Sequence, residues 1–203
     1  MTAVELLTAF SGKSAKQYQQ FFRFSEKTRI VGVEIHAVGT RSTTARYTDE
    51  PIPWKEVNNI LRITTADGYE AISGVTSNDQ HAFSDQHLIE LQGVAAALLA
   101  LQTLDPVEVG AILDRMRPDL SDRTRSSIDI ALWDLAARKA GLPVYKLLGE
   151  KRRSIEAYAS FPFYNALSEC IAAVDKYAGL GFMIFKFHAW GQIEKDFLLI
   201  DMI

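Results

Sequence analysis

The sequence predicts an α+β domain followed by the first β/α units of an incomplete (β/α) barrel of the TIM type. Three observations support this prediction. β-rich runs surround an Asp-Gly pair, three amphipathic helix-like segments follow, and strand-like and helix-like segments then alternate. We expect an N-terminal extension over residues 1–28, the α+β domain over 29–150 and the start of the barrel over 151–203.

The first part of the α+β domain is predicted to be a sheet. Residues 29–38, 59–65 and 69–75 are rich in the side chains that favour strands. The polar segment after the first of these runs predicts a long loop. Asp67-Gly68, between the other two runs, favours a tight turn between antiparallel strands. We therefore expect a three-stranded antiparallel sheet over residues 29–76.

Three helices are expected next. The first begins near Ser84 or Asp85, the second has Pro106 in its first turn, and the third covers residues 126–140. Gly141-Leu142-Pro143 ends the third helix, because glycine accepts the left-handed conformation and proline cannot continue a helix. The expected apolar sides are Leu88, Leu91, Val94, Ala95, Leu98 and Leu99, then Val107, Ile112, Leu113 and Met116, and finally Ile128, Ala131, Leu132, Leu135 and Ala136.

The pattern then changes to β-α-β, with strands over residues 154–160 and 182–188 and a helix over 166–180. This order implies parallel strands. A further helix is predicted to begin at Glu194. A (β/α) barrel takes about 250 residues, but only 49 are present from Ile155 to Ile203. We therefore expect the barrel to be incomplete in this chain.

The bulk composition excludes several classes of partner. The chain is 48% hydrophobic and 23% charged, with a formal net charge of −3 and a pI near 5.8. This charge argues against a polyanion-binding surface, so nucleic acid is not an expected partner. No signal peptide or membrane span is recognisable, so we expect a cytoplasmic protein without a membrane partner. The single cysteine, Cys170, is expected to be a small buried side chain.

The segment Lys186-Phe187-His188 is the candidate for chemistry. On a strand, Lys186 and His188 point to one side, while Phe185 and Phe187 point to the other. The phenylalanines suit the helix-facing exterior of a barrel. The two basic residues suit its interior, at the C-terminal rim where barrel enzymes place their reactive groups.

A longer segment carries a family resemblance. Residues 127–149, SIDIALWDLAARKAGLPVYKLLG, resemble the signature helix of the mandelate racemase/muconate lactonizing enzyme branch of the enolase superfamily. By the order of elements, the resemblance covers about residues 29–203 and implies that residues 29–150 form the family's capping domain. Asp129 and Trp133 within the helix are interpreted as structural residues.

The resemblance implies Mg²⁺-dependent abstraction of a proton alpha to a carboxylate. It places a Lys-x-Lys motif, or a variant, on the second barrel strand. Lys186 matches the first lysine and His188 stands in place of the second. A histidine, with an ordinary pKa of about 6.5, titrates near neutral pH, whereas a lysine at about 10.4 must be shifted down. We predict that His188 is an acid or base, or a hydrogen-bonding partner of the substrate carboxylate. Lys186 is predicted to stabilise the developing enediolate.

The same resemblance places three acidic Mg²⁺ ligands on the third, fourth and fifth barrel strands, with the opposite catalytic group on later strands. None of these strands is expected in this chain. We therefore predict no metal ligand here and no Mg²⁺-dependent activity for the 203-residue chain by itself.

Two loops of the capping domain choose substrates in this family, and they correspond to about residues 39–54 and 74–87. The candidate substrate contacts in the first loop are Arg41, Arg46, Tyr47 and Trp54. His81 and His87 lie six residues apart in a polar loop without a third ligand nearby, so they are not assigned to a metal site. His36 is expected to be packed or on the surface.

The leading function is dehydration of a sugar acid, a small carboxylate, by a parent enzyme that is a homo-oligomer when full length. The alternatives within the superfamily are racemisation, epimerisation and cycloisomerisation. A different class of hypothesis is a non-catalytic truncated remnant or interaction module. The reading frame beyond Ile203 discriminates between these classes, because acidic residues on further strands would support the enzyme.

Overall fold

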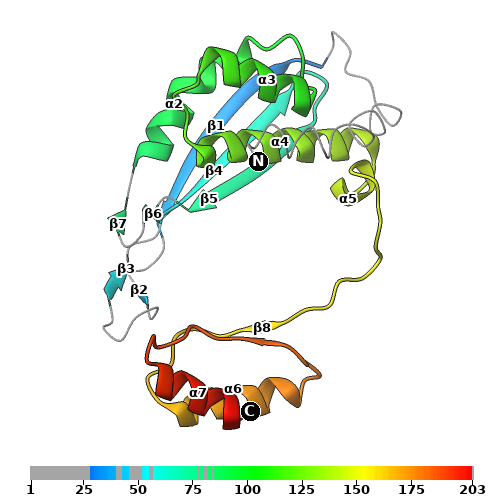
Figure 1. Ribbon diagram of the computed structural model, residues 1–203. Helices are drawn as coiled ribbons and strands as arrows, with labels where there is room; N and C mark the ends of the chain where they lie inside the picture. The colour runs from blue at the N-terminus through cyan, green and yellow to red at the C-terminus, as the bar shows by residue number, and fades with distance from the viewer. Residues whose placement is uncertain are drawn as a thin grey trace. The chain divides into compact units, whose positions relative to one another are not determined.

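The computed structural model describes residues 28–39, 43–45, 52–54, 57–76, 78–79, 82–83 and 85–202. These residues fall into two compact units (Figure 1). One unit is formed by the described residues of 1–41 and 55–151, and the other by those of 42–54 and 152–203.

The first unit is built on a three-stranded antiparallel sheet, as predicted. Strands β1 (Ile30–Gly39), β4 (Val57–Thr65) and β5 (Glu70–Thr76) lie in the order β1-β4-β5. The Asp-Gly turn between β4 and β5 is confirmed, because Gly68 has a φ of 86° and its amide donates to the carbonyl oxygen of Thr65. Glycine accepts this left-handed conformation without the steric cost that a side chain would add.

Two short hairpins occupy segments that were predicted to be loops. Strand β2 (Thr43–Ala45) pairs with β3 (Ile52–Trp54), and β6 (Asn78–Asp79) pairs with β7 (Ala82–Phe83). Strands of two or three residues are too short to show the alternation of apolar and polar residues on which the prediction depended.

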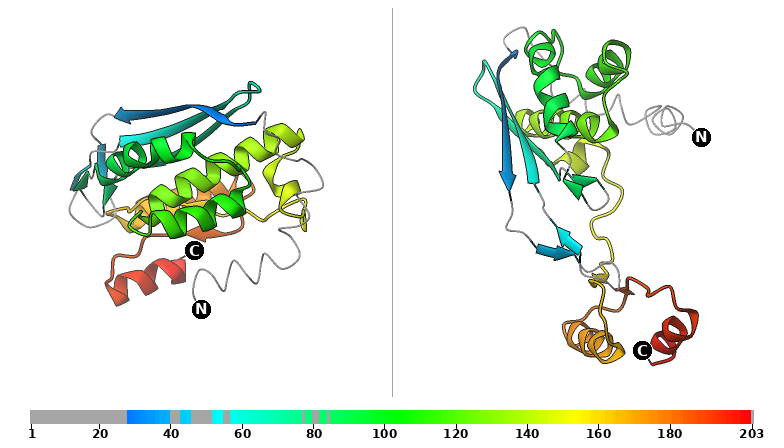
Figure 2. Two further views of the ribbon diagram at one scale, coloured as in Figure 1. Left: turned by 90° about the horizontal axis from the view of Figure 1, so that it is seen from above. Right: turned by 90° about the vertical axis from the view of Figure 1, so that its left-hand side faces the viewer.

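Four helices follow, α2 (Gln86–Leu99), α3 (Pro106–Met116), α4 (Asp122–Ala140) and α5 (Val144–Leu147). Figure 2 shows α2, α3 and α4 on one face of the β1-β4-β5 sheet. The carboxylate of Asp105 caps α3 by accepting from the amides of Val107 and Glu108 at 3.0 and 3.2 Å. Gly141 ends α4 with a φ of 63°, in agreement with the predicted termination.

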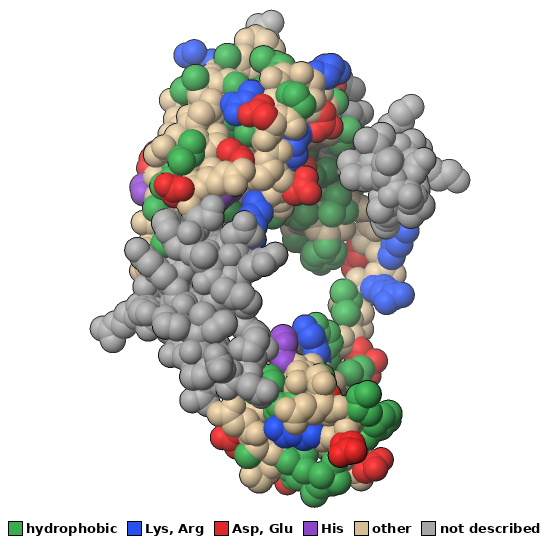
Figure 3. Space-filling model, turned by 60° about the vertical axis from the view of Figure 1, so that its left-hand side comes forward, with side chains coloured by type: hydrophobic (Ala, Val, Ile, Leu, Met, Phe, Trp, Pro, Cys, Tyr) green, Lys and Arg blue, Asp and Glu red, His purple; other side chains and the backbone are tan. Residues whose placement is uncertain are grey.

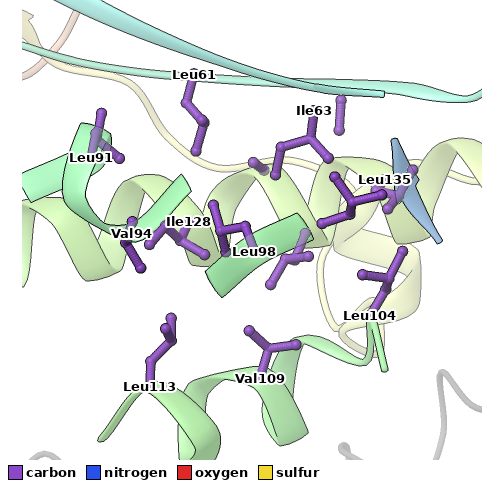
Figure 4. Packing of buried hydrophobic residues seen from close by; sticks show 14 of the residues in the cluster. Leu61, Ile63, Leu91, Val94, Leu98, Leu104, Val109, Leu113, Ile128 and Leu135 are labelled. Carbon is purple, nitrogen blue, oxygen red and sulfur yellow. The ribbon is translucent and has the colours of Figure 1, made fainter. Parts of the chain in front are cut away.

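The core of this unit lies between the helices and the sheet (Figure 4). Leu61 and Ile63 from β4 face side chains of α2 and α4, and the whole predicted stripe of α4 is buried. Three residues predicted on apolar sides are instead exposed: Leu99, Val107 and Met116. In α3 the buried residues are Pro106, Val109 and Leu113, so its buried side is rotated from the predicted one.

Two carboxylates tie α4 to the sheet. Asp134 accepts from the backbone amide of Ile72 on β5 at 3.0 Å and is also paired with Arg138. Asp67, in the β4–β5 turn, accepts from the side chains of Thr28, Thr65 and Lys139. Asp134 and Lys139, which both belong to the segment 127–149, therefore connect α4 to the sheet.

The N-terminus of α4 is held by a half-buried carboxylate on α2. Glu90 accepts from the backbone amide of Ser121 at 3.0 Å, from its hydroxyl at 2.6 Å, and from the hydroxyl of Thr124. Ser121 is also the N-cap of α4, which explains why the helix begins one turn earlier than predicted. A carboxylate at this position is favoured by the helix dipole as well.

This contact predicts an acid-sensitive contribution to stability. Burial would by itself raise the pKa of Glu90, but the hydrogen bonds from Ser121, Thr124 and Gln86 lower it from 4.5 to about 2. As pH falls from 4.5, the unfolded chain takes up this proton before the folded chain does, so stability is lost between pH 4.5 and about 2.

We expect Glu90→Gln to lower the free energy of unfolding by up to about 3 kcal/mol at pH 7 and by roughly half as much or less at pH 3. Urea denaturation at the two pH values measures the difference. Asp85→Asn is the control, because the Asp85 carboxylate makes no capping hydrogen bond. An equal loss at both pH values would contradict the assignment.

The second unit contains a parallel β-α-β arrangement. Strand β8 (Ala159–Ser160), helix α6 (Leu167–Ala178), strand β9 (Phe185–Lys186) and helix α7 (Ile193–Met202) follow in order, and β8 pairs with β9 in parallel. The elements and their direction agree with the prediction, but both strands are shorter than expected. Two strands are fewer than a stable sheet requires, which accounts for their short regular stretches.

Much apolar surface of the second unit remains exposed. Ile155, Met183 and Ile193 are 83%, 82% and 73% exposed. Figure 3 shows hydrophobic side chains among charged ones on the surface around α6 and α7. Apolar side chains exposed to this extent are typical of surfaces that another element covers. Within the described residues, no helix is long and apolar enough to cross a membrane.

Candidate functional site

The candidate site begins at β9, where the predicted alternation of side chains is present. Phe185 and Phe187 pack into a cluster with Phe161 and with Ala173 and Val174 of α6. The rings of Phe161 and Phe185 are stacked with centroids 5.9 Å apart. The phenylalanines therefore face the helix, and Lys186 is exposed on the opposite side of the strand.

His188 follows β9 by two residues and is half-buried. It lies in the segment that leaves the carboxyl end of a parallel strand, the edge at which β/α proteins bind ligands and carry reactive groups. Lys186 is thus on the predicted strand, whereas His188 lies two residues beyond its end and not on the strand itself as predicted.

Ser160 is a neighbour of Lys186 that the sequence analysis did not single out. The two residues are register partners in the β8–β9 pair, whereas Ala159 is the partner of Phe185. Side chains of register partners project to the same face, so Ser160 lies on the face of Lys186. A hydroxyl and an ammonium group are therefore adjacent on the face opposite α6.

The loops after β8 and β9 are joined by hydrogen bonds. The indole nitrogen of Trp190 donates to the carbonyl oxygen of Tyr164 at 2.8 Å, and its backbone amide donates to a carboxylate oxygen of Asp196 at 2.8 Å. Lys195 lies over the Trp190 ring, 4.1 Å from its centroid, and donates to the carbonyl oxygen of Asn165 at 3.3 Å. The sequence analysis did not predict this arrangement, because its contacts join residues of different elements.

Mg²⁺ does not fit the residues that the structure describes. No group of three or more His, Cys, Asp or Glu side chains with a metal-binding arrangement occurs among them. Mg²⁺ prefers several oxygen ligands in octahedral geometry. Lys186 and His188 offer only nitrogen atoms, so a magnesium site cannot be built from this face of β9 alone.

Several of the other candidate residues lie outside the part of the chain that the structure describes. Arg41, Arg46 and Tyr47 lie outside the described residues, as does the side chain of Trp54, whose backbone belongs to β3. His81 also lies outside them. The predicted substrate contacts of the capping loop therefore stay predictions.

His87 was wrongly placed in a polar loop. It is 3% exposed in the first turn of α2, and its ring contacts the hydroxyls of Thr124 and Ser127 at 3.0 and 3.4 Å. Burial lowers the pKa of His87, which favours the neutral ring. The buried hydroxyls of α4 thus explain why a histidine occupies a core position.

The remaining residues that the sequence analysis considered belong to elements other than β9. His36 is exposed on β1 and contacts Glu34 at 3.2 Å. Cys170 is buried in α6, where burial, and then the nearby Glu169 carboxylate, raise the pKa of its thiol. Trp133 packs against the cluster around Leu147, in agreement with its structural interpretation, and Asp129 is exposed.

Comparison with known sequences gives one family. Residues 54–149 match the family model described as mandelate racemase/muconate lactonizing enzyme, N-terminal domain. The chain is 28% identical over 131 residues to an arabinonate dehydratase of Saccharolobus solfataricus, covering 59% of this chain and 34% of that protein. It is 28% identical over 157 residues to an L-Lys-D/L-Arg epimerase of Methylococcus capsulatus, covering 70% and 41%. The chain thus spans less than half the length of these curated relatives.

Solved structures agree with the sequence matches. A structure from Pseudovibrio sp., assigned to the mandelate racemase/muconate lactonizing enzymes, superposes with a TM-score of 0.76 at 30% identity, covering 87% of this chain and 48% of that one. A Bradyrhizobium enolase complexed with magnesium and mandelic acid gives a TM-score of 0.64 at 25% identity, covering 81% and 46%.

The antiparallel sheet with its helices and the segment 127–149 correspond to the capping domain of an enolase-superfamily protein. Within that superfamily, the chain belongs to the mandelate racemase/muconate lactonizing enzyme family. The relatives reported above are a lyase and an epimerase of this family, so the family-level class is that of an enzyme.

Proposed function

We propose that Lys186 and His188 form one side of an active site that moves a proton on the carbon next to a carboxylate. The observation that supports this most is the placement of the two basic residues. Lys186 is the last residue of β9 and lies on the face opposite the phenylalanines that pack on α6, and His188 follows two residues later in the segment that leaves the carboxyl end of the strand. This is the position from which β/α-barrel enzymes act.

The chemistry suits the two side chains. An imidazole takes or gives a proton near neutral pH, so His188 is the proposed acid or base. The ammonium group of Lys186 stabilises the negative charge that develops on the substrate as the proton leaves. Ser160, on the same face as Lys186, offers a hydroxyl that can hydrogen-bond to a polar substrate.

Mg²⁺ is proposed as the cofactor of the whole protein, with ligands outside the residues described here. The family resemblance and the magnesium and mandelic acid bound to the Bradyrhizobium relative support this cofactor. The metal would add electrostatic stabilisation of the carboxylate. Mandelic acid is itself a small carboxylate, which supports the proposed substrate class.

The proposed reaction is dehydration of a sugar acid. The similarity to an arabinonate dehydratase supports this choice, because that relative acts on a substrate of this kind. Epimerisation is the second candidate, supported by the similarity to the L-Lys-D/L-Arg epimerase. Both reactions begin by removing a proton beside a carbonyl group, so the same His188 serves either.

The test uses the polypeptide translated from the complete reading frame that contains these 203 residues. The protein is purified and incubated with a panel of acid sugars and a panel of dipeptides, with Mg²⁺ and with a chelator. Formation of a keto-acid from an acid sugar supports dehydration, and a change of configuration in a dipeptide supports epimerisation. Absence of both reactions with every compound and with Mg²⁺ would contradict the proposal.

A further inference from the structure

We propose that Trp190 and Asp196 are positioning residues for His188, an inference that rests on the function proposed above. The arrangement, named here the Trp190 brace, consists of Trp190, Tyr164, Lys195 and Asp196. It fixes the backbone just after His188 to two other elements of the second unit. Its components do not need to touch the substrate to affect the reaction.

His188 lies between two anchored residues. On one side, Phe187 packs against both aromatic clusters of the second unit. On the other side, Trp190 is 9% exposed and packs with Phe163, Cys170 and Leu199. The backbone that carries His188 is therefore held both before and after the histidine.

Trp190 has directional contacts in addition to its burial. Its indole N–H donates to Tyr164 in the loop after β8, and its backbone N–H donates to Asp196 in α7. The acceptor Asp196 is itself fixed, because its backbone amide donates to the carbonyl oxygen of Gln192 at 2.9 Å in the first turn of α7. These two hydrogen bonds of 2.8 Å fix the orientation of Trp190 and of the backbone beside it, in addition to the burial of its ring.

The loop after β8, at the other end of the brace, is held by hydrogen bonds of its own. Glu169 in α6 accepts from the backbone amides of Asn165 and Ala166, both at 3.2 Å. Lys195 reaches the carbonyl oxygen of Asn165 while lying over the Trp190 ring. The loop after β8 is therefore anchored on α6, so that it can serve as a fixed support for the loop that carries His188.

The need for such a support follows from the position of His188. The histidine lies beyond the end of β9, where the strand's own hydrogen bonds no longer fix it. An error of about 1 Å in the placement of a catalytic group can lower the rate about 100-fold. A brace that joins the loops after β8 and β9 keeps His188 in register with Lys186.

The test combines three variants with a matched control. Trp190→Phe keeps an aromatic ring for packing but removes the N–H that donates to Tyr164. Asp196→Ala removes the acceptor for the Trp190 amide, and Asp196→Asn keeps an oxygen that can accept it. Glu194→Ala is the control, because Glu194 lies in the same turn of α7, carries the same charge and is exposed.

The first readout is the NMR signal of the His188 ring followed through a pH titration. The chain has four histidines, so the signal is assigned by its loss in His188→Asn. We expect the His188 signal to shift or broaden in Trp190→Phe and Asp196→Ala, to be largely restored in Asp196→Asn, and to be unchanged in Glu194→Ala. The signal of His36 should not respond in any of them. Circular dichroism confirms that each variant is folded.

The second readout is turnover by the complete polypeptide. We expect kcat to fall about 10- to 100-fold in Trp190→Phe and Asp196→Ala with little change in KM, because the histidine is displaced while binding groups remain. Asp196→Asn should recover most of the loss.

The two readouts separate failure of this inference from failure of the proposed function. Full turnover in His188→Asn would contradict the proposed function, and the NMR titration would still decide whether the brace positions the ring. An unchanged His188 signal in folded Trp190→Phe and Asp196→Ala would overturn the inference, even if turnover requires His188.

Discussion

Replacing His188 with asparagine is expected to lower the turnover of the complete polypeptide by about 100- to 10,000-fold, the usual contribution of a general acid or base. Asparagine keeps a hydrogen-bonding group of similar size but cannot exchange a proton near neutral pH. If His188 acts in proton transfer, most of the decrease in kcat/KM should come from a decrease in kcat and little from a change in KM. Steady-state kinetics with the substrate identified from the panels measures both parameters.

The matched control for this substitution is His36→Asn. His36 is exposed on β1 of the first unit and contacts only Glu34 among the contacts that the structure gives for it. Turnover should stay within about twofold of the unchanged protein, since surface substitutions usually have small effects. Equal turnover in the His188 and His36 variants would contradict the catalytic assignment.

The largest expected effect on stability comes from Leu98→Ala in α2. The Leu98 side chain is fully buried in the core between α2, α4 and the sheet. Removing its buried methyl groups leaves a cavity, which typically costs about 2–5 kcal/mol of the free energy of unfolding. Urea denaturation of the 203-residue chain, followed by circular dichroism, measures the change.

Its neighbour Leu99 provides a control of identical chemistry. Leu99 is 46% exposed, although the sequence periodicity placed both leucines on the apolar side. Leu99→Ala should change the free energy of unfolding by less than about 1 kcal/mol, since it leaves no buried cavity. Similar losses in the two variants would mean that the face of α2 that packs on the sheet is assigned incorrectly.

The sequence predicted the capping domain well because local and global signals agree there. At the Asp67-Gly68 turn, the stripe from Ile128 to Ala136 and the Gly141 termination, the local sequence preference agrees with the structure that the whole domain adopts. The prediction of buried residues was less accurate for apolar residues at the edge of the buried side of a helix. Val107 and Met116 of α3 are exposed, because the packing of α3 against α4 selects Val109 and Leu113 instead.

For the candidate site, the sequence predicted the strand and its alternation but not the surroundings. Lys186 was identified from a local motif, whose alternation is visible within a few residues. Ser160 and the Trp190 brace depend on strand register and on contacts between distant residues, such as Trp190 with Tyr164. No local pattern encodes such contacts. The loop residues Arg41, Arg46 and Tyr47 lie outside the described part of the chain, so their predicted roles are unchanged.

The most direct test of the central claim is exchange of the substrate's alpha proton with solvent. The complete polypeptide and its His188→Asn variant are incubated in D₂O with Mg²⁺ and the substrate identified from the panels, and deuterium beside the carboxylate is measured by NMR in recovered substrate or product. We expect deuterium incorporation with the unchanged protein, and a rate of incorporation at least about 100-fold lower with His188→Asn. Equal incorporation by both proteins would contradict the proposed role of His188.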